Sequence, residues 1–400
     1  MKIGIIREGK TPADSRVPLS PHQCSQLVEQ GLQVSVQRSE VRCFSDDQYA
    51  HLGIDVVDNI DDCDILLGVK EVPISELIPN KTYFFFSHTI KEQAYNQKLL
   101  KACVDKKIRL IDYEVLTDET GKRVIAFGKF AGMVGAHNAL WTYGERLGNN
   151  PLPRMHSLKD YAAAQKIYST TKFPNARIVL TGTGRVSSGA VQVLTDMGIQ
   201  KVRPIDFVTQ SYDLPIFTQL SSFYYAKRKD GKEFDNVQNF YDYPEEYESD
   251  FHHFLPHADI LINGIYWDNK APAFFTPEEM TQSNFNIKVI ADVTCDIAPE
   301  SSIPSTLKAS TIADPVFGYN PESRVETEPY KDASIDMMTI DNLPNELPRD
   351  ASEAFGSMFI EHVLPQLDND ESEMLDKATI TKDGDLGSHF EYLRSYLEGN

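Results

Sequence analysis

The sequence lacks any apolar run that approaches the roughly 18 consecutive residues needed to span a bilayer. Its amino terminus, MKIGIIREGK, has neither the apolar segment nor the small-residue cleavage site of a secretory signal peptide. Cysteines are few, five in 400 residues, and their spacing matches no disulfide framework. We therefore expect a protein of a reducing compartment, the cytoplasm, with no membrane as a partner.

Positive charge is also scarce in this chain. Lys and Arg number 39 against 59 Asp and Glu, so the formal net charge is −20. Such an excess of acid repels nucleic acid and anionic membranes, and we expect neither as a partner. Small anionic substrates remain compatible, because a local pocket can be basic within an acidic protein. The acidic segment that begins at Leu367, LDNDESEMLD, is typical of a solvated surface.

Common signatures of nucleophilic and metal sites are missing as well. The chain has no GxSxG nucleophile elbow and no Cys/His nucleophile signature. The segment HHFLPH, residues 252–257, contains three histidines, but its spacing matches no closed zinc pattern and no cysteine lies near it. We therefore predict no metal site, and we expect Cys295 to be a buried strand residue.

What the chain does contain is an alternation of short apolar strands with amphipathic helices. KIGII, LQVSV, DILLGV and YFFFS alternate with helical segments, the first with Ser20 as its N-cap, Pro21 in its first turn and Gly31 as its stop. Such strands are typical of a parallel sheet covered on both faces. A chain of this length predicts two domains. The aromatic-rich stretch 209–254 is expected to be an ordered insertion in the second.

A glycine-rich turn opens the second block of strands and helices. In ARIVLTGTGRVSSGAVQVL, Gly182 and Gly184 come directly after an apolar strand, and a helix pattern follows them. The first glycine permits the tight turn, the second lets the backbone approach a pyrophosphate, and the helix N-terminus offers free N–H groups. Ser187 stands at the usual third glycine. This context predicts a Rossmann dinucleotide-binding domain rather than an ordinary strand–helix turn.

The next apparent strand bears on the choice between NAD and NADP. KVRPIDF ends near Asp206, where dinucleotide-binding folds place an acid that contacts the ribose hydroxyls. A carboxylate there repels a 2′-phosphate and favours NAD. Arg203, three residues earlier, could instead receive the 2′-phosphate of NADP. The sequence thus leaves both cofactors open, with a weak preference for NAD.

Several strands of the first block are followed by a basic or titratable side chain. These side chains are Arg16, Lys70, His88 and Arg123. One such residue would be a solvated strand end or a packed histidine, but ligands of parallel sheets bind at the carboxyl ends of strands, so four together indicate a site. Burial and nearby cations lower the pKa of a lysine toward acid–base work, and histidine titrates near neutral pH without help.

On these residues, the chain resembles the saccharopine dehydrogenase (lysine-forming) family. Specifically, it resembles the lysine–2-oxoglutarate reductase half of the bifunctional lysine-degrading enzymes of animals and plants. The resemblance covers most of the chain and includes LGVKEVP, KTYFFFSHTIKEQ, VLTGTGRVSSGA, ADILINGIYW and SIDMMTIDNLPNELPRDASEAFG. Within the wider alanine dehydrogenase and transhydrogenase superfamily, FFSHTIK and the IDNLP segment are specific to this branch.

The resemblance implies an α/β fold of two Rossmann-like, doubly wound parallel-sheet domains with a cleft between them. The first, a substrate and catalytic domain, would be discontinuous and comprise residues 1–132 and 345–400. The second, residues 133–344, would bind the dinucleotide. Lys70 and His88 would be the acid–base pair, and the substrate-binding residues would be Arg16, Lys91, Glu114, Arg123 and Phe127. The cofactor-binding residues would be Gly182, Gly184, Arg185, Val186, Asp206, Asn263, Ile265, Tyr266, Asp292 and Asp341.

The resemblance also implies a reaction. The side-chain amine of L-lysine would condense with the ketone of 2-oxoglutarate, and reduction of the imine by NADH or NADPH would give saccharopine. Saccharopine has three carboxylates, which Arg16, Lys91 and Arg123 could bind. Two alternatives stay open, an alanine dehydrogenase acting on ammonia and pyruvate and a non-catalytic nucleotide-binding sensor. The extra cations Lys91 and Arg123 argue against the alanine dehydrogenase, and the acid–base pair argues against the sensor. The sequence leaves the oligomeric state open.

Overall fold

The computed structural model describes residues 1–234, 236–369 and 371–399, and it divides into two compact units. Unit 1 comprises Met1–Phe127 and Pro348–Asn400, and unit 2 comprises Gly128–Leu347. The sequence placed these divisions after residues 132 and 344. Each unit has a parallel-dominated sheet with helices, so the predicted α/β class of two Rossmann-like domains is confirmed. No helix in the described ranges is both long and apolar enough to cross a membrane.

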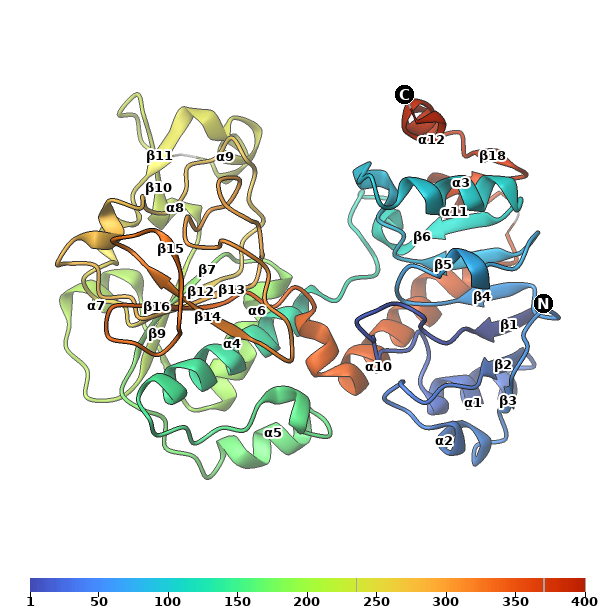
Figure 1. The fold of residues 1–400 in the computed structure, drawn as a ribbon, viewed down its shortest axis with the longest axis horizontal. Coiled ribbons are helices and arrows are strands. Elements are labelled where there is room, and N and C mark those ends of the chain that lie inside the picture. The colour runs from blue at the N-terminus through green and yellow to red at the C-terminus, as the bar shows by residue number, and fades with distance from the viewer. Residues whose placement is uncertain (235, 370, 400) are drawn as a thin grey trace. The chain divides into compact units, whose positions relative to one another are not determined.

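The sheet of unit 1 has the order β18-β17-β6-β5-β4-β1-β2-β3 (Figure 1). Its strands are β1 (Lys2–Ile5), β2 (Gln33–Gln37), β3 (Asp55–Val57), β4 (Ile65–Leu67), β5 (Thr82–Phe85), β6 (Arg109–Asp112), β17 (Thr379–Lys382) and β18 (Asp385–Leu386). The first six are parallel, and their order is the 3-2-1-4-5-6 order of dinucleotide-binding folds. The last two, which the sequence did not predict, run antiparallel at the β6 edge.

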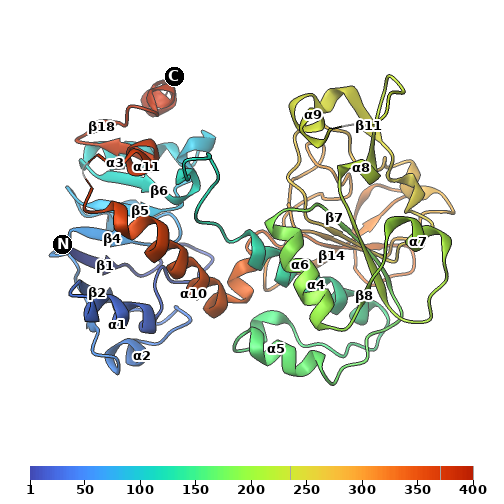
Figure 2. The ribbon, with the colours of Figure 1, turned by 180° about the vertical axis from the view of Figure 1, so that it is seen from behind.

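Helices cover both faces of this sheet. They are α1 (Pro21–Glu29), α2 (Asp46–Ala50), α3 (Gln97–Asp105), α10 (Pro348–Met358), α11 (Glu373–Ala378) and α12 (Arg394–Glu398). α1 begins as predicted, because Ser20 and Gln23 form a reciprocal capping box around Pro21. One face packs against α1 and α10, with Phe84 and Phe355 in its core, and Figure 2 shows α10 crossing this face. The other face packs against α3.

The sheet of unit 2 has the order β15-β14-β16-β13-β12-β7-β9-β8. Its strands are β7 (Arg177–Thr181), β8 (Gln200–Lys201), β9 (Ile216–Leu220), β12 (Ile260–Asn263), β13 (Val289–Asp292), β14 (Val316–Asn320), β15 (Val325–Thr327) and β16 (Ile335–Met338). β14 and β15 are antiparallel additions at one edge. The helices are α4 (Gly128–Arg146), α5 (Tyr161–Tyr168), α6 (Arg185–Asp196), α7 (Pro204–Thr209), α8 (Ser222–Tyr225) and α9 (Val237–Asp242).

The predicted insertion, residues 209–254, is ordered but is not an insertion throughout. Its first part supplies β9, which pairs with β7 along its whole length. The remainder forms α8, α9 and the hairpin of β10 (Ala226–Arg228) and β11 (Tyr247–Ser249). Some of its aromatic side chains, among them Tyr225, Phe240 and Phe251, are buried in the core of unit 2, whereas Phe223 and Tyr241 are about half exposed. The aromatic content therefore reflects a packed layer only in part.

The predicted strand KVRPIDF is wrong in its second half. Only Gln200–Lys201 pairs, as the outermost strand β8, and Pro204 then opens α7. Proline cannot donate to a ladder hydrogen bond but fits the first turn of a helix, which explains the change. The strand beside β7 is therefore β9.

Candidate active site

Two proton-carrying side chains follow neighbouring strands of unit 1. Lys70 follows β4 and His88 follows β5, and these strands pair in parallel, so both residues lie at the carboxyl edge of the sheet. Burial and then the positive charge of Arg16 lower the pKa of Lys70 below its ordinary value. The backbone of His88 is left-handed, with φ 53°. Such a backbone at a non-glycine residue is uncommon and is often a mark of functional positions.

Glu71, which the sequence analysis did not select, holds the ring of His88. The Nδ1 atom of His88 lies 2.6 Å from Glu71 Oε1, and Lys10 Nζ lies 2.7 Å from Glu71 Oε2. Burial raises the pKa of Glu71, but the hydrogen bonds from His88 and Lys10 outweigh it and lower the pKa to about 2. An ionised Glu71 accepts a hydrogen bond from Nδ1–H of His88. In a neutral imidazole the other nitrogen, Nε2, then has no proton and can accept one.

Phe86 joins several predicted residues in one cluster. The ring of His88 stacks on Phe86 with centroids 6.5 Å apart, and the ring of Phe127 lies 6.0 Å from it. The guanidinium carbon of Arg123 is 5.6 Å from the centre of the same ring. Arg16 in turn lies 4.3 Å over Phe127. The structure thus gathers two arginines and His88 around two aromatic rings.

Glu114 is the meeting point of two further cations. Its Oε1 lies 3.5 Å from Lys91 Nζ and 3.8 Å from Arg123 Nη1. Its Oε2 is buried and has no hydrogen-bond partner among the described residues. A carboxylate oxygen without a donor is costly to bury, so this atom is a candidate acceptor for a cationic group of a ligand.

Arg16 is held by a buried carboxylate. Its guanidinium forms a two-point contact with Asp14, 2.6 Å from Nη2 to Oδ2 and 3.0 Å from Nε to Oδ1. Both side chains are almost inaccessible. A bidentate pair fixes the plane of the guanidinium. The sequence motif DSR contained both partners, but only Arg16 was selected from it.

The glycine turn of unit 2 has the geometry expected from its sequence. Gly182 follows β7 with φ +93°, and a side chain there would press against the carbonyl of Gly264. Gly184 caps α6, and a Cβ there would meet no atom within 4 Å. Arg185 and Val186 form the first turn of α6. Open space before a twelve-residue helix with free N–H groups fits a dinucleotide pyrophosphate.

The departure at Ser187 has a structural explanation. Its hydroxyl donates to Thr181 O at 2.9 Å and lies 3.2 Å from Gly264 O, so it ties α6 to the turn. The close approach of α4 and α6 depends on Gly132 of α4 and Gly189 of α6. A Cβ on Gly132 would lie within van der Waals overlap of the backbone of Val186, and one on Gly189 would overlap the backbone of Lys129.

The other predicted cofactor residues lie at the same edge of unit 2. Asn263 and Asp292 end the paired strands β12 and β13, and their side chains share a 2.9 Å hydrogen bond. Burial raises the pKa of Asp292, which also accepts from Thr306 at 2.6 Å. Ile265 and Tyr266 follow β12, and Tyr266 is 89% exposed. Asp341 follows β16.

Asp206 does not fit its predicted place at the ribose. It lies on α7 and pairs with Arg203 through two contacts of 2.7 and 2.9 Å. The carbonyl of the next residue, Phe207, accepts from Arg177, which begins β7, so α7 returns toward the amino edge of the sheet. The residue that follows the strand beside β7 is Ser221. The basis for preferring NAD is therefore wrong.

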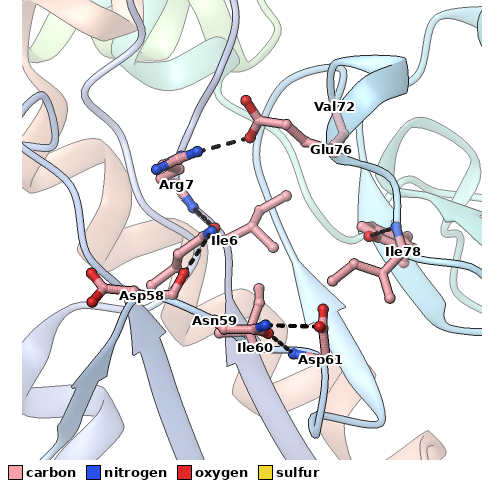
Figure 3. Close-up of a pocket in the computed structure, with 11 residues that line it drawn as sticks. Ile6, Arg7, Asp58, Asn59, Ile60, Asp61, Val72, Glu76 and Ile78 are labelled. Carbon is pink, nitrogen blue, oxygen red and sulfur yellow. Dashed lines mark hydrogen bonds and ion pairs between the residues drawn. The ribbon is translucent and has the colours of Figure 1, made fainter.

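Three other features contribute no predicted site residue. A pocket of about 230 Å³ beyond the carboxyl ends of β1, β2 and β3 is lined by Arg7, Asp58 and Glu76, with Glu76 turned toward Arg7 (Figure 3). The side chains of Asp250, His252 and His253 come within 4.8 Å of one another, but Asp250 also pairs with Lys227 and both histidines are exposed. Cys295, predicted in a strand, follows β13 with φ +58° and is half-buried.

Known proteins resemble this chain over nearly all of its length. Residues 4–134 match the family model described as alanine dehydrogenase/PNT, N-terminal domain. The mitochondrial alpha-aminoadipic semialdehyde synthase of Mus musculus is 30% identical over 99% of this chain and 48% of its own. The saccharopine dehydrogenase [NAD(+), L-lysine-forming] of Emericella nidulans is 29% identical over 93% of this chain and 94% of its own. The chain spans about half the length of the synthases that it matches.

A solved L-alanine dehydrogenase has the same fold. It superposes with a TM-score of 0.64 over 100% of this chain and 99% of its own, at 16% identity. Residues 4–134 thus match the alanine dehydrogenase/PNT N-terminal domain, and the chain as a whole is similar to the lysine-forming saccharopine dehydrogenases over nearly all of its length.

Proposed function

We propose that this chain is an oxidoreductase of lysine metabolism, which condenses L-lysine with 2-oxoglutarate and reduces the imine to saccharopine, reversibly. The names of its relatives support the reaction class. The observation that carries the proposal is the gathering of Lys70, His88 and several cations at one sheet edge. A proton-transfer pair beside carboxylate-binding groups is what this substrate pair requires.

In this proposal Lys70 and His88 divide the proton transfers. Imine formation removes a proton from the amine of lysine and delivers one to the departing hydroxyl. The lowered pKa of Lys70 increases the fraction of its neutral form, which accepts a proton. His88 exchanges protons at Nε2, because Glu71 occupies Nδ1. Which of the two acts first is a question for their separate variants.

The remaining residues of the edge bind the substrates. Arg123 would bind a carboxylate, with Lys91 as a point charge. Arg16, which is buried and paired with Asp14, would add positive charge to the substrate site. Glu114 would accept a hydrogen bond from the ammonium of an amino acid at Oε2, which has no hydrogen-bond partner among the described residues. Phe127, stacked on Phe355 with ring centroids 5.0 Å apart, offers a rigid apolar wall for a methylene chain.

The proposed cofactor is a nicotinamide dinucleotide, which would supply the hydride. Gly184 and the first amides of α6 would hold its pyrophosphate, and Asn263, Ile265, Tyr266, Asp292 and Asp341 would line the rest of its site. Because Ser221 rather than Asp206 follows the strand beside β7, no carboxylate there excludes a 2′-phosphate. We therefore propose that NADP is accepted as well as NAD.

Two alternatives follow from the same superfamily. The matched family model and the solved structure both carry the name alanine dehydrogenase, and the pair of Lys70 and His88 would suit ammonia and pyruvate. The second alternative is a sensor that binds nucleotide without catalysis.

The proposed compartment is the reducing cytoplasm. All five cysteines are unpaired, which supports this proposal.

The test is consumption of NADH, and separately of NADPH, followed by absorbance. The protein is mixed with lysine and 2-oxoglutarate, and in parallel with ammonia and pyruvate. Oxidation only with lysine and 2-oxoglutarate would support the proposal, and oxidation only with ammonia and pyruvate would replace it with alanine dehydrogenase. Binding of the cofactor without oxidation in any mixture would favour the sensor.

A further inference from the structure

Glu8 is a carboxylate at the topological switch point of the unit 1 sheet. It follows β1, the strand at which the order of the sheet reverses, and β1 pairs with β2 on one side and β4 on the other. Ligands of doubly wound sheets bind at such a point. The Glu8 side chain is partly buried there and has no part in the proposed proton transfers.

The carboxylate of Glu8 binds the backbone that carries Lys70. Its Oε1 accepts the N–H of Val69 at 2.7 Å, and its Oε2 accepts the N–H of Lys70 at 2.9 Å. The two oxygens thus take two consecutive amides at the exit of β4. Hydrogen bonds to an ionised acceptor are stronger than neutral ones. The position of the Lys70 backbone is therefore coupled to β1 through a single side chain.

Only the ionised form of Glu8 can accept both amides well. A protonated carboxyl has one strong acceptor oxygen, and its hydroxyl oxygen faces the second N–H poorly. Burial raises the pKa of Glu8 to about 7, although the hydrogen bonds from Val69 and Lys70 oppose the rise. The other charged or titratable groups acting on Glu8 are Asp14, Arg16 and Tyr113.

We propose that ionised Glu8 is a positioning residue, which fixes the depth and orientation of Lys70 through the amides of residues 69 and 70. The inference rests on the proposed role of Lys70. Glu8 acts through the backbone of Lys70 and needs no contact with substrate. When Glu8 takes up a proton, one of the two amide hydrogen bonds weakens, and Lys70 becomes less well placed and more solvated.

The variant Glu8→Gln tests this directly, because an amide keeps one acceptor oxygen but turns an NH2 group toward the second N–H. The matched control is Glu76→Gln, which makes the same change in an exposed carboxylate whose ion-pair partner is Arg7 at 3.6 Å. Two quantities are measured for each. One is the turnover number against pH, and the other is the pKa of the Lys70 amine, from the pH dependence of its acylation followed by mass spectrometry.

The proposal expects Glu8→Gln to lower turnover about tenfold or more above neutral pH, with cofactor affinity unchanged. The difference from the parent protein should shrink as the pH falls through about 7, because the parent then also lacks the second strong acceptor. The pKa of Lys70 should differ from that in the parent protein, because its surroundings change. Glu76→Gln should change neither quantity.

The proposal would be overturned if folded Glu8→Gln kept the turnover number and the Lys70 pKa of the parent protein. It would equally be overturned if the only change in the variant were a lower thermal stability. Acylation measures the Lys70 amine even if the protein catalyses a reaction other than the proposed one. Failure of the proposed function can therefore be distinguished from failure of the proposal about Glu8. If Glu8→Gln does not fold, the unaltered protein is used. Its Val69 and Lys70 amides should lose protection from hydrogen exchange as the pH falls through about 7. Constant protection would overturn the proposal.

Discussion

The carboxyl edges of the two sheets have a similar architecture and opposite chemistry. In unit 1, the parallel strands β4, β5 and β6 are followed by Lys70, His88 and Glu114, all of them ionisable. In unit 2, the turn after β7 consists of small residues, and the side chains at the ends of β12 and β13 bond to each other. The shared topology gives the place for a ligand, and the residues at the strand ends give the chemistry.

The difference lies in where polar atoms find their partners. In unit 2, Asn263 and Thr306 both donate to Asp292, and the turn before α6 presents backbone amides. In unit 1, Glu114 meets Lys91 and Arg123 only at 3.5 and 3.8 Å, and one of its oxygens has no partner in the described part of the chain. A satisfied edge can hold a ligand without changing its charge, whereas an edge of incompletely paired charges can move protons.

The largest effect expected from breaking the unit 1 edge is that of Lys70→Met. Methionine keeps much of the apolar volume but carries no proton, so turnover should fall by about 10²–10⁴-fold. Cofactor affinity, measured by fluorescence titration, should stay unchanged. Lys81→Met, at the amino end of β5, is the control and should keep parent turnover. Parent-like turnover in Lys70→Met would remove Lys70 as a catalytic residue.

A substitution at the carboxyl edge of unit 2 should lower cofactor affinity, the quantity that Lys70→Met is expected to leave unchanged. In Gly184→Ala the new methyl meets no atom within 4 Å, so the fold should be unaffected, but it occupies the space before α6. We expect cofactor affinity to fall about tenfold or more, with no change in the melting temperature.

Gly182→Ala is the matched comparison for Gly184→Ala. Its backbone is left-handed at φ +93°, and its methyl would lie 2.7 Å from Gly264 O, so it should lower the melting temperature. Equal cofactor affinity in Gly184→Ala and the parent would move the proposed pyrophosphate site away from this turn.

The contrast between the two edges also marks what the sequence could predict. The glycine turn and the polar strand ends were recognisable because each is a local pattern of a few residues. Glu8 and Glu71 were missed because their partners lie 62 and 17 residues away, and only the sheet order brings them together. Asp206 was misplaced because Pro204 ended the strand early and β9 took its place.

A smaller effect is expected when one cation of unit 1 is removed. Arg123→Ala should raise KM for 2-oxoglutarate, or Kd for saccharopine, by about 10- to 100-fold, since a charge-assisted hydrogen bond contributes about 1.5–3 kcal/mol. Turnover at saturation should change little. Arg38→Ala is the control, because Arg38 is exposed and pairs with Asp58. A change confined to cofactor affinity would contradict the assignment of Arg123 to the substrate.

The smallest expected effect concerns the choice of cofactor at the unit 2 edge. Ser221→Asp adds a carboxylate directly after β9, where dinucleotide-binding folds place an acid. Repulsion of a 2′-phosphate across a partly solvated gap is worth about 1.4 kcal/mol, so NADPH should bind about tenfold more weakly while NADH is unaffected. Asp206→Ser is the comparison and should leave both affinities unchanged, because α7 turns back toward the amino edge. The opposite pattern would be a change in the NADH to NADPH preference in Asp206→Ser and no change in Ser221→Asp. It would identify Asp206 as the residue that discriminates between the two cofactors, and it would mean that β9 is not the strand beside the ribose.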